Sequence, residues 1–260
     1  MNPNVRRALA FLVPPLAMFV VFVLMWHAAV VAFEWKPFLV PSPALVAKTF
    51  IEKRETLAKA AGLTAAGAAC GFASSFIVGL IIALVFSQSA AVRRALYPYA
   101  IFLQTVPIVA IAPLIVLWSG AGFRSVVIVS FIIGLFPIIT NATAGLTSVD
   151  RSLVELFEVN NATRWQILFR LRLPNAIPNL VTGAKISSGL SVIGTVIGEF
   201  VAGYGTQNFG LGYLIVMTSG QLRTPELFAA VFTSTLLGLA IFATVAFVGD
   251  LIVARWSDRR

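Results

Sequence analysis

The sequence predicts an all-α integral membrane protein with about six transmembrane helices. Hydrophobic residues make up 59% of the chain and charged residues 11%, whereas soluble domains have roughly 45–50% apolar and about 25% charged residues. Several apolar runs reach the roughly 20 residues that a helix needs to cross a bilayer. One long polar interval, residues 150–178, has a helical pattern of its own. Spanning segments are helical because lipid offers no partners to backbone polar groups.

Six apolar runs are the candidate spans, and we expect them within one domain covering residues 1–260. The first run is long and lacks a small-residue cleavage site, so we interpret it as a retained span. The third run contains Pro98, Pro107 and Pro113, and an interior proline removes a backbone hydrogen bond and bends a helix. The spans lie at about residues 8–33, 63–86, 96–118, 125–146, 177–201 and 227–253.

The polar segment 34–60 follows the first span. Ser42 can cap a helix with Pro43 at its first position. An apolar stripe of Val46, Phe50 and Leu57 predicts an external amphipathic helix. Such a helix lies on the membrane surface or contacts a solute-binding protein, and the sequence leaves both interpretations open. The Gly-rich segment 202–225 is predicted to be external as well.

The interval 150–178 predicts two short helices around a turn. Ser152 is a candidate N-cap because Glu155 stands three residues later, which is the capping-box spacing. Asn160-Asn161 suits a chain reversal because Asn tolerates the left-handed conformation. A second helix, residues 164–173, is expected to end before Pro174.

Arginine placement predicts the orientation. Six spans put both chain ends and the 150–178 interval on one side of the membrane, and most arginines beside span ends fall on that side. On the opposite side, the short turn has Arg124 and the Gly-rich segment has Arg223, while the basic residues of the 34–60 segment are accompanied by Glu52 and Glu55. The positive-inside rule then predicts cytoplasmic termini and a cytoplasmic 150–178 loop. The arginines of the predicted cytoplasmic side are Arg6, Arg7, Arg93, Arg94, Arg151, Arg164, Arg170, Arg172, Arg255, Arg259 and Arg260.

The loop resembles the cytoplasmic signature of bacterial binding-protein-dependent ABC-importer permeases. That pattern is E-A-A, three residues, G, nine residues and I-x-L-P; Glu155 and Leu173-Pro174 match it, while Phe157 and Asn161 depart from it. The whole chain is similar to the branch that serves nitrate, sulfonates and taurine, and most of all to permeases for riboflavin or thiamine-pyrimidine precursors. The further matching runs are Pro41-Ser42-Pro43, 107–118, Phe136-Pro137, Gly198-Glu199-Phe200 and Gly210-Leu211-Gly212.

The resemblance implies a type I ABC importer permease fold in the bacterial plasma membrane, with alternating access to the pathway. It implies four partners: an ATP-binding cassette ATPase dimer, a second permease copy in a homodimer, an external or periplasmic solute-binding protein, and membrane lipid. The 150–178 loop would carry a coupling helix that docks on the ATPase. The coupling residues it implies are Glu155, Leu156, Glu158, Asn161, Ala162, Arg164 and Trp165.

No catalytic set is visible in the sequence. There is no GxxxxGK[ST] phosphate loop, and the one histidine, His27, has no nearby ligand set for a metal. We therefore expect no enzyme activity, metal or cofactor in this chain, with ATP and Mg on the partner ATPase. The net charge of +9 is explained by orientation in the membrane and not by nucleic-acid binding.

Polar groups within the spans are the candidate pathway residues. Lys185 and Glu199 stand 14 residues apart, so they lie about 21 Å apart on nearly one helix face. An intramembrane charge is a functional candidate, although Lys185 can snorkel to one interface and Glu199 can be solvated at the other. The fifth span also carries a small-residue row that is expected to pack tightly or face the pore. The pathway candidates are Gln104, Thr105, Asn141, Lys185, Gly194 and Glu199.

Three functions compete on the sequence alone. The first is the permease of an ATP-driven importer for a heteroaromatic vitamin precursor such as riboflavin or hydroxymethylpyrimidine, or else for a sulfonate, taurine or nitrate anion. The second is an ion-coupled secondary transporter or channel, a class that often shows inverted repeats and midplane acids. The third is a lipid-active enzyme. The structured loop favours the first.

Overall fold

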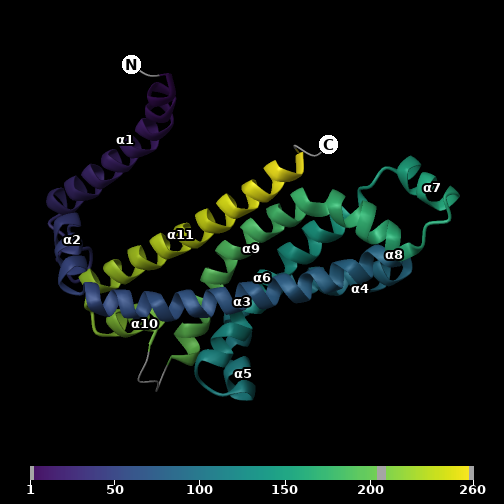
Figure 1. Cartoon of the computed structure of the whole chain (residues 1–260). Helices are drawn as coiled ribbons and strands as arrows, with labels where there is room; N and C mark the ends of the chain where they lie inside the picture. The colour runs from purple at the N-terminus through teal and green to yellow at the C-terminus, as the bar shows by residue number, and fades with distance from the viewer. Residues whose placement is uncertain (1–2, 204–208, 258–260) are drawn as a thin grey trace.

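The computed structural model describes residues 3–203 and 209–257, with side chains described for 13–203 and 209–255, and every element in these ranges is helical (Figure 1). The predictions for 204–208, for Asp258, Arg259 and Arg260, and for the Arg6 and Arg7 side chains lie outside it. The elements are α1 Pro3–Ala32, α2 Pro43–Glu52, α3 Arg54–Gln88, α4 Ala90–Thr105, α5 Ile108–Ser119, α6 Phe123–Thr147, α7 Arg151–Val159, α8 Arg164–Ile167, the π-helical turn η1 Leu168–Arg172, α9 Leu173–Ala202, α10 Leu211–Gly220 and α11 Thr224–Ser257.

The core is the contact of α6 with α3 and α9. Small side chains line it, and their hydroxyls satisfy carbonyls of the neighbouring helix: Ser130 Oγ donates to Ser191 O at 2.8 Å and Ser187 Oγ to Gly134 O at 2.7 Å. A Cβ on Gly194 would lie 2.8 Å from Ser130 Cα, so only glycine fits there. Close backbone approach of this kind compensates for the weak hydrophobic drive between helices in lipid.

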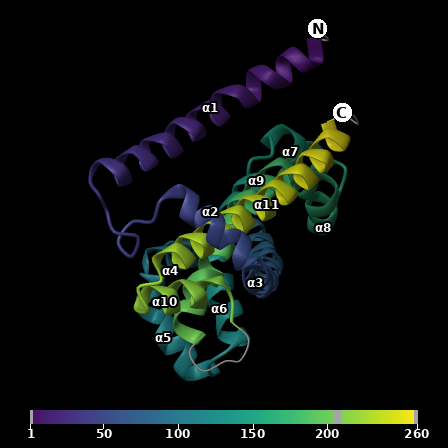
Figure 2. The same ribbon diagram turned by 90° about the vertical axis from the view of Figure 1, so that its left-hand side faces the viewer.

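The N-terminal helix α1 stands away from this core (Figures 1 and 2). Most of its described side chains are exposed, and its aromatic contact with the rest of the chain is Trp26, 5.7 Å from Phe228 of α11. Among the described residues, five helices are long and apolar enough to span a membrane, or six if the bent pair α4–α5 counts as one span. The prediction of about six spans is confirmed.

The third predicted span is not one helix. The structure breaks it into α4 and α5, which meet at 97°. Pro107 has no N–H with which to continue the α4 hydrogen-bond ladder, and its ring favours the extended conformation seen at Val106 (φ −69°, ψ 125°). Pro98 and Pro113 lie inside helices instead.

The second loop helix does not end before Pro174, contrary to the prediction. The chain stays helical from Arg164 to Ala202, because the π-turn precedes the proline. Leu173 N–H donates to Leu168 O, five residues back. This wider turn makes room for the Pro174 ring, which otherwise meets the carbonyl four residues earlier.

Two segments that were predicted to be external also differ from expectation. Ser42 caps α2 as predicted, accepting from Leu45 N–H at 3.3 Å, but the stripe to Leu57 is divided between α2 and α3. The polar residues before the predicted second span belong to the same helix, so α3 begins at Arg54. The Gly-rich segment contains the buried helix α10, since Leu211, Leu214 and Thr218 are all almost fully buried.

Candidate functional site: an exposed loop and a closed opposite end

The loop helix α7 is capped by Asp150, not by the predicted Ser152. Ser152 N–H donates to Asp150 Oδ1 at 2.9 Å, and the Ser152 hydroxyl donates to the same oxygen at 2.8 Å. These hydrogen bonds hold the pKa of Asp150 below its ordinary value, the backbone bond having the larger effect. Glu155 pairs with Arg151 at 3.0 Å across one helical turn, so it does not close a capping box.

The turn after α7 has the geometry that a glycine supplies. Asn161 has φ 55°, and it stands where the permease signature has glycine. Asn adopts this left-handed conformation at little cost, so the departure from the signature is conformationally neutral. The capping box of this region lies at α8, where Thr163 Oγ1 and Gln166 satisfy each other's backbone N–H groups.

Apolar side chains cover the outside of this loop. Val159 is 80% exposed and Trp165 66% exposed, and the Trp165 ring stacks on Phe169 at 6.0 Å. We call Leu153, Leu156, Val159, Trp165 and Phe169 the docking surface. Exposed apolar patches rimmed by polar groups mark sites of contact with another protein or with the membrane. The rim holds the exposed Glu155, Glu158, Asn161 and Arg164, with the half-buried Ala162 behind them.

Three members of the docking surface were not predicted from the sequence to be coupling residues: Leu153, Val159 and Phe169. The signal for Leu153 was present in the apolar face of the short helix, whereas Val159 ends α7 and Phe169 belongs to η1. The sequence did not show which side chains would stay exposed, because that depends on how α7 is oriented relative to the rest of the chain.

At the opposite end of the molecule, Glu199 is buried rather than solvated. It is 5% exposed. The Thr64 hydroxyl lies 2.9 and 3.0 Å from its two carboxylate oxygens, and Gly212 N–H donates to Oε2 at 2.8 Å. Thr64 Oγ1 in turn accepts from Leu211 N–H at 2.9 Å.

This network, which we call the α10 junction, caps one helix with side chains of two others. Gly210 stands at the N-cap of α10 and has no side chain with which to cap it. Glu199 of α9 and Thr64 of α3 take that role, and the positive end of α10 favours the carboxylate. A Cβ on Gly210 or Gly212 would overlap Glu199, so both glycines are required for the approach.

Lys185, the other charged candidate, pairs with a residue that was not predicted. Its Nζ lies 2.6 Å from Asp250 Oδ1 of α11. Lys185 also borders a groove of about 720 Å³ between α9 and α11, whose other walls include Gly189, Ile193 and Phe242. Glu199 therefore contacts α3 and α10, and Lys185 contacts α11, although both lie on nearly the same face of α9.

The remaining pathway candidates lie apart. Gln104 and Thr105 are exposed at the end of α4, where Thr105 Oγ1 donates to Phe102 O at 2.9 Å. Asn141 is half-buried and donates to Pro137 O within α6 at 2.9 Å. Gly194 packs on α6, which favours a packing role over a pathway role.

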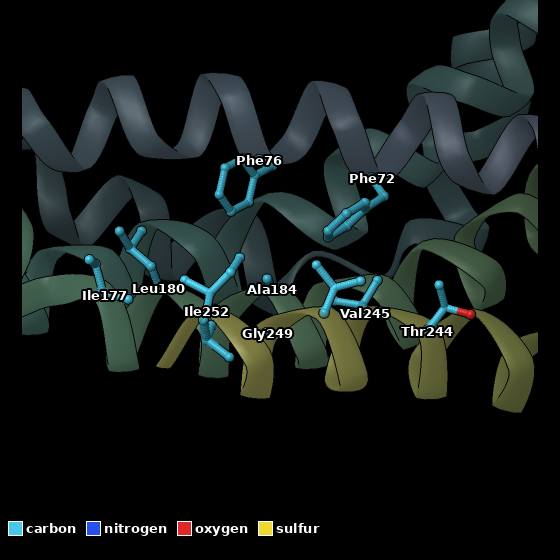
Figure 3. Close-up of a pocket in the computed structure, with 11 residues that line it drawn as sticks. Phe72, Phe76, Ile177, Leu180, Ala184, Thr244, Val245, Gly249 and Ile252 are labelled. Atoms are coloured by element: carbon cyan, nitrogen blue, oxygen red, sulfur yellow. The ribbon is translucent and has the colours of Figure 1, made fainter. Parts of the chain in front are cut away.

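A second cavity, of about 390 Å³, lies between α3, α9 and α11 (Figure 3). Phe72 and Phe76 reach into it from α3, toward Val245 and Ile252 of α11. Its lining is apolar apart from Thr244, so it offers no convergent polar groups for chemistry. Within the described residues, no group of three or more His, Cys, Asp or Glu side chains is placed to hold a metal.

Comparison with known proteins decides the family. Residues 75–260 match the family described as binding-protein-dependent transport system inner membrane component. The chain belongs to this family. It is therefore the multi-pass membrane component of an ABC importer, whose ATPase is a separate subunit. The family implies that ATPase and a solute-binding protein as partners.

Named relatives extend over most of the chain. The riboflavin transport system permease protein RibX of Chloroflexus aurantiacus is 35% identical, over 98% of this chain and 95% of its own. The formylaminopyrimidine transport permease protein ThiX of Halalkalibacterium halodurans is 34% identical, over 84% of this chain and 86% of its own. An inward-facing structure of the MetNI methionine ABC transporter matches with a TM-score of 0.65 at 19% identity, covering 79% of this chain and 98% of that one. This likeness confirms the type I permease fold.

Proposed function

We propose that two copies of this chain form the pathway of an importer for a small heteroaromatic vitamin precursor, such as riboflavin or hydroxymethylpyrimidine. The observation that carries the proposal is the similarity, over most of the chain, to the riboflavin and formylaminopyrimidine permeases at 34–35% identity. Permeases named for sulfonate, nitrate and taurine are 27–30% identical over 68–72% of this chain. A sulfonate, taurine or nitrate anion is the second candidate solute.

The loop end would face the cytoplasm, and the α10 end would face the solute-binding protein. Arginine placement supports this orientation, and the exposed docking surface supports contact with the ATPase. In this arrangement the ATPase dimer moves α7 and α8. Because α8 continues through η1 into α9 without a break, motion of the loop would be transmitted directly to the helix that holds Lys185. ATP and Mg would be held by the ATPase, and this chain would hold no cofactor.

The pathway would run along the groove between α9 and α11, covered by the second permease copy. A charge facing lipid is unfavourable by a few kcal/mol, and Lys185 and Asp250 border this face with side chains 26% and 70% exposed. A second copy would remove that exposure. Gln104, Thr105 and Asn141 would line the pathway only if the α4–α5 side faced it.

Reconstitution tests the solute. The permease, its ATPase and its binding protein are placed in liposomes, and ATP-dependent uptake of riboflavin, hydroxymethylpyrimidine, taurine and nitrate is measured. We expect uptake of one of the two heteroaromatic compounds. Uptake of taurine or nitrate alone would replace the heteroaromatic proposal with the anion one, while uptake driven by an ion gradient without ATP would contradict both.

Glu155→Lys tests the coupling role. The substitution breaks the Arg151 pair and reverses charge beside the docking surface, so ATP hydrolysis should continue without transport. Orientation is tested separately with cysteines at Asn160 and Gln221, both exposed. We expect position 160 to react only from the cytoplasm and position 221 only from outside; the reverse pattern would overturn the orientation.

A further inference from the structure

Two cavities at the loop end have basic walls. One, of about 300 Å³, lies between the α3–α4 turn, the end of α6 and η1; the other, of about 370 Å³, lies between α4 and α6. Both include Arg93 and Thr147 in their walls. Arg172 also lines the smaller cavity, and Arg94 and Tyr97 also line the larger one. No Asp or Glu lines either cavity.

The three arginine side chains have no acidic partner among the described residues. Arg172 donates to Ser87 O at 2.5 Å, and Arg94 Nε donates to Ala90 O at 3.3 Å within its own helix. The Arg93 side chain forms neither a hydrogen bond nor an ion pair with any described residue. The neighbouring acids are engaged elsewhere: Asp150 accepts from Ser152, and Glu155 pairs with Arg151.

Backbone and hydroxyl groups add to this positive field. The N-terminal turn of α4, beginning at Ala90, presents the positive end of a helix beside Arg93. The wall of the larger cavity contains Tyr97, Thr140 and Thr143, and the buried Thr143 hydroxyl has no hydrogen-bond partner among the described residues. A guanidinium presents a fork of donors that suits phosphate oxygens. The matching ligand is an anion with several oxygens.

The position in the membrane selects among such anions. From Arg93 and Arg94 the lining continues one turn along α4 to Tyr97 and Pro98, toward the apolar part of the helix. The outer face of α4 there exposes Leu96 and Tyr99, so the cavity opens beside side chains that lipid would cover. A tyrosine at this depth is typical of the headgroup region. Cationic pockets between spanning helices bind phospholipid headgroups.

We propose that Arg93 and Arg94, with Arg172 behind them, bind the phosphate of an anionic phospholipid from the leaflet on the loop side. The lipid phosphate would bridge α4 and η1, so it would join the core to the segment that leads into the docking loop. This site is independent of the transported solute, because it lies at the loop end, away from the α9–α11 groove.

The test uses the permease–ATPase complex in nanodiscs of phosphatidylcholine, with phosphatidylglycerol added in steps. Lipid retained by the protein is counted by native mass spectrometry. We expect the double variant Arg93→Gln/Arg94→Gln to weaken phosphatidylglycerol retention about thirtyfold, from roughly 1 kcal/mol for each of the two basic residues near the surface. The control is Arg255→Gln, which removes one charge from the same end on α11, and its effect is compared with that of the single variant Arg93→Gln.

A second arm separates lipid from soluble phosphate. Inorganic phosphate is added to phosphatidylcholine nanodiscs, and melting temperature is followed. Stabilisation by phosphatidylglycerol but not by phosphate supports the proposal, whereas equal stabilisation by phosphate identifies a soluble-anion site instead. An equal loss of lipid in Arg255→Gln would reduce the effect to general surface charge and overturn the site.

The wild-type chain provides a measurement that does not depend on the variants folding. Photoreactive phosphatidylglycerol is cross-linked to the complex, and the modified peptides are mapped. We expect modification within residues 90–98 and around Thr140. Modification confined to other helices would overturn the assignment.

Discussion

The two ends of this molecule are built in opposite ways. At the α10 end, Glu199 is satisfied by Thr64 and Gly212 from two other helices, and glycines at 210 and 212 bring backbone against its side chain. At the loop end, aromatic side chains such as Trp165 stand in the open, and the Arg93 side chain has no partner among the described residues.

The difference indicates at which end one chain satisfies its own buried polar groups and covers its own apolar surface. A buried carboxyl group restricts the arrangement of the helices around it, because losing its hydrogen bonds in a low-dielectric interior is costly. The α10 junction therefore holds α3, α9 and α10 in one arrangement. The loop end leaves apolar area and charge unsatisfied, and those are the properties of a surface that other molecules cover. The continuous helix from Arg164 to Ala202 joins the two ends.

The largest effect should come from Trp165→Ala at the loop end. Interface tryptophans are frequent hot spots worth about 2 kcal/mol or more, so we expect ATPase affinity to fall at least about thirtyfold with the permease still folded. Affinity is measured by titrating the ATPase onto permease in nanodiscs. The matched control is Trp118→Ala in α5, 77% exposed at the other end. An equal loss in the control would contradict a specific docking surface.

Gly212→Ala should break the α10 junction. The added Cβ would overlap Val196 O and lie 2.8 Å from Glu199 Cβ, so α9 and α10 must separate. Overpacking of this kind costs about 1–3 kcal/mol, and we expect a lower melting temperature and reduced transport. Gly220→Ala is the control, because its Cβ would meet nothing within 4 Å. Unchanged stability of the Gly212 variant would show that the junction is not tightly packed.

Thr64→Val should loosen the same end without overpacking it. It removes a hydroxyl that serves both Glu199 and Leu211 N–H, at a cost of about 1–3 kcal/mol for buried groups left unsatisfied. We expect faster hydrogen exchange at the Leu211 and Gly212 amides, measured by mass spectrometry on α10 peptides. Thr233→Val in α11 is the control, since the Thr233 hydroxyl donates to Ala229 O of its own helix. Equal protection in both variants would rule out the trans-capping role.

The smallest effect concerns pH at the loop end. The pKa of Asp150 is lowered on folding, so its contribution to α7 is present above the ordinary carboxyl value of 3.8 and disappears as pH falls through the lower, folded-state value. Docking should therefore be insensitive to Asp150 ionisation between about pH 6 and 8. Asp150→Asn should weaken the α7 cap only slightly at pH 7. If ATPase affinity changed with pH near neutrality, and this change vanished in Asp150→Asn, the lowered pKa of Asp150 would be contradicted.

Several features of the molecule follow from local sequence. The apolar runs predicted the spans, since the length and hydropathy of each are local properties. The 150–178 interval predicted the loop, and Asn161 takes the left-handed turn as expected. Ser42 caps α2 because cap and helix lie together in sequence. The helix end predicted at Pro174 was wrong because the ring of this proline fits beside a π-turn.

Local pattern determined the fold class, the spans, the family and the position of the polar loop at residues 150–178. Tertiary structure decided the partners of the charged residues. Glu199 meets Thr64, 135 residues away, and Lys185 meets Asp250, 65 residues away. Periodicity assigns such residues to a face of a helix but does not identify the helix opposite. Periodicity placed Glu199 and Lys185 on nearly the same helix face. Packing against α3 and α10 buries Glu199 in the α10 junction, whereas packing against α11 leaves Lys185 at the edge of a groove.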